Sequence, residues 1–135
     1  MNSETLVRKH LIASGVETFT AAIIAQAAAK LPTDSSIEIT QVKDKVPFVR
    51  LLLTSTDEQL IEFATSIHAI EQEGLIVHET MRTNASSIEM GYKIPVKKLT
   101  DKQTERLMEI LRLKWFTITP NLSVDAHSIS SEIGE

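Results

Sequence analysis

The chain has four histidines that could take part in acid–base or metal chemistry: His10, His68, His78 and His127. No two of them have the i, i+4 or short-loop spacing with which histidines bind a metal ion. His68 lies near the end of a helical pattern and His78 in a predicted strand, so their side chains could converge with Glu71 or Glu79. Since nothing else supports a metal site or an acid–base pair, we expect histidines at the surface or at the edge of the core.

Other catalytic signatures are also missing from the sequence. The chain has no cysteine, which excludes disulfides, thiolate metal sites and a cysteine nucleophile. Its four glycines are isolated, so none belongs to a phosphate-binding loop, and no serine lies in a nucleophile elbow. We therefore expect a protein that is not an enzyme and needs no cofactor or metal.

Length and composition indicate one domain with a real hydrophobic core. The chain has 135 residues and a net charge of −4. It lacks the run of roughly 20 apolar residues that a membrane span needs, and its first residues do not resemble a secretory signal. We expect a cytoplasmic protein with a domain over residues 1–118 and a polar C-terminal tail over 119–135.

The clearest element is an amphipathic helix over residues 56–74, which should organise the fold. Ser55 with Glu58, and Thr56 with Gln59, both have the spacing of a capping box. Gly74 can close the helix in a left-handed conformation. The predicted core-facing stripe of this helix consists of Leu60, Phe63, Ala64, Ile67 and Ile70.

The remaining elements follow from hydrophobic periodicity and from turn residues. Three more helices are predicted over residues 3–14, 20–31 and 100–114. Four strands are predicted over residues 36–43, 46–55, 75–83 and 87–96.

Two of these strands have a definite prediction for their faces. In the strand over 87–96, the alternating Ile88, Met90, Tyr92, Ile94 and Val96 should point to the core. In the strand over 75–83, strict alternation places Leu75, Val77 and Met81 on one face. It places His78, Thr80 and Arg82 on the other.

Together these elements predict the α+β class: an N-terminal helical hairpin followed by two β-β-α units. Because the connections are hairpins and short turns, we expect an antiparallel sheet with helices packed mainly on one face. The element order is similar to that of small acidic secretion chaperones, which mask apolar segments of other proteins. The similarity concerns the order of elements only.

The function that these features favour is a non-catalytic protein-binding module, such as an adaptor, a chaperone-like protein or a regulatory protein. A sheet edge or a helical groove would receive the partner, which is another protein or a second copy of the chain in a homodimer. The candidate partner-binding residues are His78, Arg82, Lys93, Lys97, Lys98 and Trp115.

The alternative is a nucleic-acid-binding regulator. Residues 24–39 have a spacing similar to the first helix and turn of a helix-turn-helix, followed by a polar segment. However, Pro32 cannot adopt the positive φ that the turn favours, and the following segment is β-branched and lacks arginine. The basic stretch 93–114 is the other candidate surface, although the net negative charge of the chain opposes binding to phosphates.

Overall fold

The computed structural model describes residues 3–118, without the side chains of residues 113–118. The predicted tail over 119–135 lies outside the described residues. The elements in chain order are α1 (Ser3–Ala13), α2 (Thr18–Ala28), β1 (Ser36–Val42), β2 (Phe48–Ser55), α3 (Asp57–Ser66), α4 (His68–Gln72), β3 (Val77–Thr83), β4 (Ile88–Pro95) and α5 (Asp101–Ile118). This order confirms the predicted helical hairpin and the two β-β-α units.

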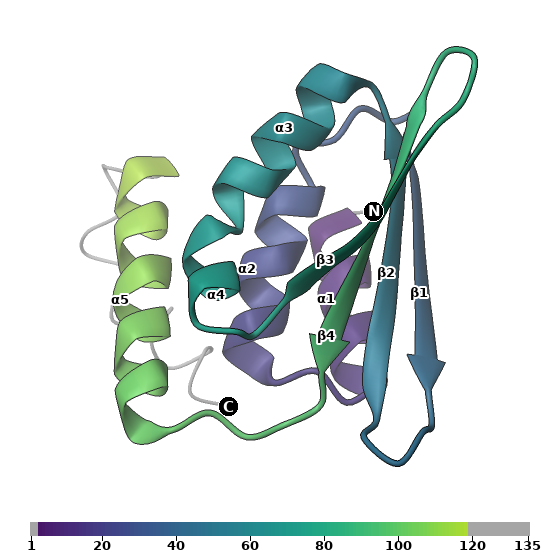
Figure 1. Cartoon of the computed structure of the whole chain (residues 1–135). Coiled ribbons are helices and arrows are strands. Elements are labelled where there is room, and N and C mark those ends of the chain that lie inside the picture. Colours follow the sequence, from purple (N-terminus) through teal and green to yellow (C-terminus); the bar gives the residue numbers. More distant parts are fainter. Residues whose placement is uncertain (1–2, 119–135) are drawn as a thin grey trace.

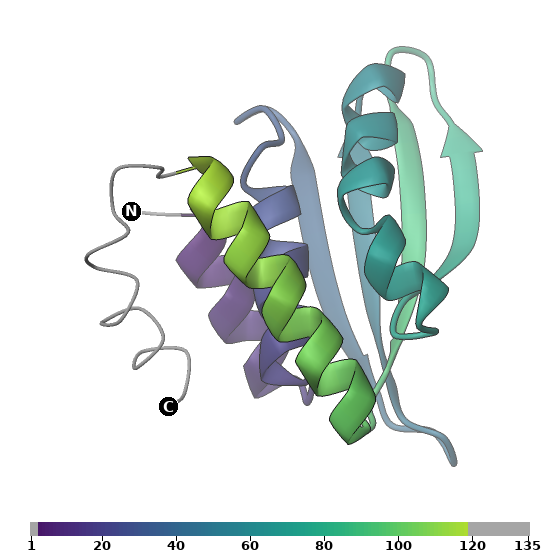
Figure 2. The same ribbon diagram turned by 90° about the vertical axis from the view of Figure 1, so that its left-hand side faces the viewer.

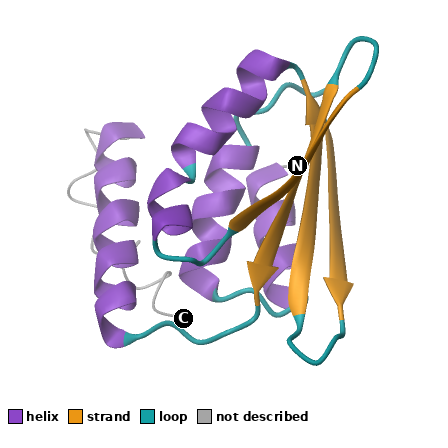
Figure 3. Cartoon of the chain, viewed as in Figure 1, coloured by secondary structure: helices purple, strands orange, loops and turns teal. Residues whose placement is uncertain are grey.

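The four strands form one antiparallel sheet in the order β1-β2-β4-β3, so β1 and β3 are its edges. All the helices lie on one face of this sheet, and no element of the described chain covers the other face (Figures 1 and 3). α1 and α2 lie over the β1–β2 half, α3 and α4 lie toward β4 and β3, and α5 packs outside α2 (Figure 2). The predicted α+β class is therefore confirmed.

The N-terminal hairpin is positioned by its caps. Gly15 ends α1 with a φ of +107°, a conformation that residues with a Cβ rarely adopt. The Glu17 carboxylate then accepts hydrogen bonds from the backbone amides of Phe19 and Thr20, each at 3.0 Å. This side-chain cap explains why α2 begins at Thr18, two residues before the predicted start.

The predicted central helix is divided in two, so the expectation of one uninterrupted helix over 56–74 is wrong. α3 ends at Ser66 and α4 begins at His68, with the fully buried Ile67 between them at φ −103° and ψ 5°. The Thr65 and Ser66 hydroxyls donate to carbonyls one turn back, at 2.9 and 3.0 Å, which weakens a helix at that point. Thr56 caps α3 as predicted, and Gly74 closes α4 at φ +72°.

The alternative capping residue, Ser55, has a different role. Its side chain is buried at the end of β2 and shares a 2.8 Å hydrogen bond with the Ser35 hydroxyl, just before β1. This hydroxyl pair joins the start of the edge strand to the central strand.

The core lies between the sheet and the helices, with β2 at its centre. Val49, Leu51 and Leu53 point toward the helices and are fully buried. The predicted stripe of the central helix faces them, because Phe63, Ile67 and their neighbours along α3 and α4 are buried in the same cluster. Burying one such side chain contributes roughly 1.5–3 kcal/mol.

A β-bulge overturns the predicted faces of the strand over 75–83. The register between β3 and β4 shifts between His78 and Thr80, with Glu79 as the extra residue. His78 therefore lies opposite Tyr92 on the helix-covered face, while Val77 lies opposite Lys93 on the bare face. The predicted faces of Val77 and His78 are wrong, because strict alternation does not continue through a bulge. Met81 and Arg82 remain on opposite faces, as predicted.

α5 begins with the predicted capping box. The backbone amide of Thr100 donates to the Gln103 side chain at 3.0 Å, and the amide of Gln103 donates to the Thr100 hydroxyl at 3.1 Å. The Gln103 side chain also donates to the Glu73 carbonyl at 3.3 Å, which ties α5 to the end of α4. Leu107 and Leu111 are buried in the core cluster.

Candidate functional site

The β1 edge is regular along its whole length. All seven residues of β1 pair with β2 without a register shift, so the other side of the strand presents backbone N–H and C=O groups that no strand of the described chain pairs. Glu38 is its one charged residue, and the strand contains no proline or lysine. Such an edge is a template for an additional strand.

The two faces of β1 differ in the polarity and burial of their side chains. Ile37 and Ile39 are half-buried and pack against the core, while Ser36, Glu38 and Thr40 are exposed on the bare face. A strand added beside β1 would therefore meet an apolar row on one face and a polar row on the other.

The β3 edge is different, because it is interrupted and charged. All seven residues of β3 are exposed, and the bulge at Glu79 breaks the ladder. Arg50 of β2 reaches across the bare face to Glu79, with 3.2 Å between Nε and Oε1. Bulges and charged side chains are features with which edge strands discourage further pairing.

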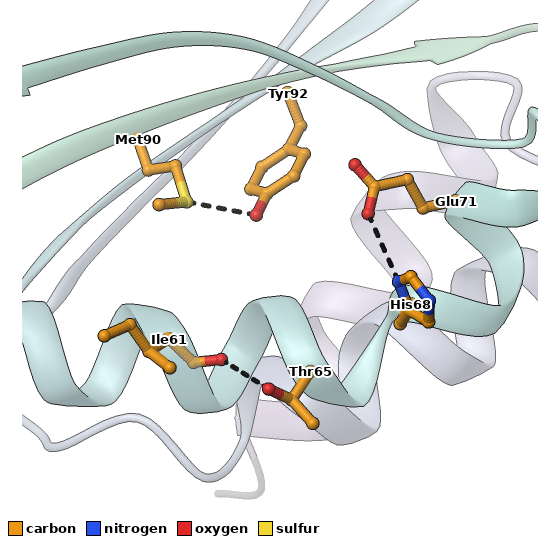
Figure 4. Close-up of polar contacts among 6 residues, drawn as sticks. All are labelled: Ile61, Thr65, His68, Glu71, Met90 and Tyr92. Atoms are coloured by element: carbon orange, nitrogen blue, oxygen red, sulfur yellow. Dashed lines mark hydrogen bonds and ion pairs between the residues drawn. The ribbon is translucent and has the colours of Figure 1, made fainter.

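Two of the histidines contact Glu71 or Tyr92: His68 at the start of α4 and His78 on β3. The His78 ring lies edge-on to Tyr92, with 5.5 Å between the ring centroids, and His68 Nδ1 lies 3.8 Å from Glu71 Oε1 (Figure 4 shows the second contact). Glu71 also acts electrostatically on Tyr92. Of the two histidines, His68 therefore approaches Glu71 and His78 contacts Tyr92, while Glu79 pairs with Arg50.

The buried member of this group is the Tyr92 phenol, which is protonated and hydrogen-bonded. Burial, with a smaller contribution from Glu71, raises the pKa of Tyr92 to about 12, so the phenol keeps its proton at neutral pH. Its hydroxyl donates to Met90 Sδ at 3.0 Å (Figure 4). Within residues 3–118, no group of three or more histidine, aspartate or glutamate side chains is placed to hold a metal ion.

A hollow between α2 and α3 is too small to hold a substrate. It is lined by Ala27, Leu31, Gln59 and Phe63 among others, and its volume of about 10 Å³ matches a single water molecule. Ligand pockets usually have volumes of roughly 300–1,000 Å³.

The candidate residues predicted from the sequence fall into separate groups. His78 and Arg82 lie on opposite faces of β3, at the far edge from β1. Lys93, Lys97 and Lys98 lie together at the end of β4 and in the segment that follows it. Trp115 belongs to α5, and its side chain is outside the described residues. The structure does not bring these residues into one surface, and their role in partner binding stays a prediction.

Two further lysines join the second group. Lys43 and Lys45 lie in the β1–β2 turn, and the backbone amide of Val96 donates to the Pro47 carbonyl at 3.3 Å. The turn and the segment after β4 therefore lie side by side at one end of the sheet (Figure 1). We call Lys43, Lys45, Lys93, Lys97 and Lys98 the lysine end.

The sequence does not reveal this cluster directly, because Lys43 and Lys45 are about fifty residues from the other three lysines along the chain. The signal that could have found it is the pairing of β2 with β4, which places Phe48 opposite Pro95. That pairing joins strands that are not consecutive in the sequence.

The helix-turn-helix interpretation gains no support from the fold. The segment that would form the recognition helix is β1, and α2 is buried along most of its length. Among the described helices, none has both the length and the apolar character required to cross a bilayer.

Comparison with known proteins identifies no relative. The chain matches no protein-family model, no curated protein and no solved structure. The two sheet edges and the lysine end are therefore the features of the molecule that bear on its function.

Proposed function

We propose that this protein is a protein-binding module that receives an extended segment of a partner as an additional strand beside β1. The observation that carries the proposal is the outer edge of β1, which is seven residues long, has no bulge and pairs with no strand of residues 3–118. Strand addition draws affinity from main-chain hydrogen bonds and specificity from alternate side chains.

The side chains of β1 support this function. A partner strand would place its apolar residues beside Ile37 and Ile39 and its polar residues beside Ser36 and Thr40. The protein would thereby shield the apolar residues of a segment that is exposed in the free partner. That activity corresponds to an adaptor, a chaperone-like protein or a regulatory protein, and it requires no catalytic group.

Proline substitutions at Thr40 and Gln41 test the proposal. Backbone N–H groups alternate in direction along a strand, so one proline removes a hydrogen bond to β2 and the other removes only an outward donor. Both side chains are exposed, which keeps the core intact. The outward variant, in which proline replaces a residue whose N–H points away from β2, should keep the melting temperature of the wild type and lose its partner. The inward variant, in which proline removes the hydrogen bond to β2, should melt at a lower temperature.

The measurement is capture from the source cell by the wild type and both variants, with thermal melting of each protein. A stoichiometric protein that the wild type retains and the outward variant loses supports strand addition. Recovery of the monomer alone, together with a metabolite that raises its melting temperature, would refute the proposal.

A nucleic-acid-binding regulator remains the second candidate, and the lysine end is the observation that favours it. Lys43 and Lys45 add positive charge to the basic stretch 93–114. A gel shift with random duplex DNA at low salt tests this function, and no retention at micromolar protein would exclude it.

A further inference from the structure

The lysine end holds positive charge that the described protein does not neutralise. None of its five lysines forms an ion pair with a carboxylate within residues 3–118, whereas Arg50 and Arg106 each have a glutamate partner. Lys43, Lys45, Lys97 and Lys98 are exposed. Asp44 and Asp101 are the acidic residues in the same turn and in the first turn of α5, so the net charge of this end is positive in a chain of net charge −4.

One lysine is held in place on the bare face. Lys93 Nζ lies 4.3 Å from the centroid of the Phe48 ring, and Arg50 lies over the same ring at 5.4 Å. Phe48 is 6% exposed, so its ring is covered and cannot stack on a nucleic-acid base. This geometry favours a flexible acidic polypeptide over single-stranded nucleic acid, which usually binds by base stacking as well as charge.

The lysine end begins where β1 stops. Lys43 directly follows Val42, and the segment after β4 lies two strands away, a distance of about 10 Å. A few extended residues span that distance at roughly 3.3 Å each. A chain that pairs with β1 can thus continue from the edge onto the lysines without a large detour.

We infer that the partner segment carries a run of acidic residues immediately before the part that pairs with β1. This inference rests on the proposed strand addition. Every pair in the sheet is antiparallel, so an added strand that follows the same pattern runs opposite to β1 and has its first residues beside Val42. The acidic run at the N-terminal side of the segment therefore meets the lysine end.

Designed peptides test the inference. The probe is a fluorescent peptide of alternating valine and threonine, matched in length to β1 and preceded by a run of glutamates. The comparison peptides carry glutamines instead, or carry the glutamates after the strand segment. We expect the glutamate-first peptide to bind about tenfold more tightly than either, from several exposed charge pairs of modest strength each, and to lose this advantage at high salt.

Two matched charge reversals locate the effect. Lys43→Glu with Lys45→Glu should abolish the advantage of the glutamate-first peptide and leave binding of the glutamine peptide unchanged. Lys9→Glu with Lys30→Glu changes the net charge equally at exposed positions outside the lysine end, and should preserve most of the advantage. Thermal melting checks that all variants fold.

Each other outcome has a defined meaning. Equal binding of the three peptides would refute the acidic run and leave strand addition standing. Failure of every peptide to bind would refute strand addition, and the inference with it. Tighter binding of an oligothymidylate of equal charge, lost in Lys43→Glu with Lys45→Glu, would assign the lysine end to nucleic acid.

Discussion

β1 and β3 occupy equivalent positions at the two edges of one sheet, yet only β3 has the features with which edge strands resist new partners. β3 has a bulge at Glu79 and an ion pair from that residue to Arg50, and all seven of its residues are exposed. β1 has an unbroken register and a half-buried apolar row. An edge without protection is a liability in a free protein, and for this reason the proposed partner segment is placed beside β1 and not beside β3.

The helix layer contributes to this difference. α1 and α2 lie over the β1 half (Figure 2), and Ile37 and Ile39 pack against the hydrophobic core on this side of the sheet. On the other side, Met81 is 62% exposed although it points to the helix-covered face. A segment added at β1 would therefore extend an existing core, whereas one added at β3 would gain little apolar cover.

The largest expected effect tests whether both edges depend on one core. Ile67→Asp places a carboxylate at a fully buried position, which costs several kcal/mol of a total stability of roughly 5–15 kcal/mol. We expect loss of cooperative melting and of amide protection in β1 and β3 together, measured by circular dichroism and hydrogen exchange. Protection that persists in β1 alone would show that the two edges are independent.

The next effect concerns pH and the β3 side. Burial raises the pKa of Tyr92 to about 12, above the ordinary value of 10.0, so the unfolded state loses this proton first as the pH rises. Stability should be unaffected by Tyr92 below pH 10 and should fall by about 1.4 kcal/mol per pH unit from there toward 12. Tyr92→Phe should remove this part of the pH dependence.

Tyr92 is the one tyrosine of the chain, so tyrosinate absorbance reports this residue alone. A spectroscopic titration of the folded protein should show a midpoint well above that of free tyrosine. A midpoint near 10 would mean that the phenol is open to water and that the β3 side is looser than described.

The smallest effect separates the two edges by substitution. A Cβ at Gly91 would collide with Thr80 Oγ1, so Gly91→Ala should cost about 1–2 kcal/mol, measured by urea unfolding. Thr80→Ala in the same chain should recover most of that loss. Binding at β1 should not change, and weaker peptide binding by Gly91→Ala would show that the partner contacts β3 as well.

Local signals predicted most elements of the fold. The helix caps at Thr56 and Thr100 depend on residues that are close together in the sequence, and so does the alternation along β4. The bulge at Glu79 was not predictable in this way, because it depends on how β3 meets β4. The break at Ile67 depends on hydroxyls that bond back to their own helix, a choice that helix periodicity does not reveal.

The candidate site was predictable only in part. His78, Arg82 and the lysines of 93–98 could be named from charge and position, but their distribution over the β3 edge and one end of the sheet follows from the strand order. Lys43 and Lys45 join the lysine end only because β2 pairs with β4. Pairing between distant segments is a tertiary property, and local patterns do not determine it.

The Ser35–Ser55 hydroxyl pair has a consequence for the speed and strength of docking. It joins the N-terminal end of β1 to β2, while the β1–β2 connection over residues 43–47 restrains the other end. Both ends of β1 are thus held in place, so the strand would lose little conformational freedom if the proposed partner segment paired with it. Removing either hydroxyl would loosen the β1 edge without changing the outer backbone groups with which the proposed partner strand would pair.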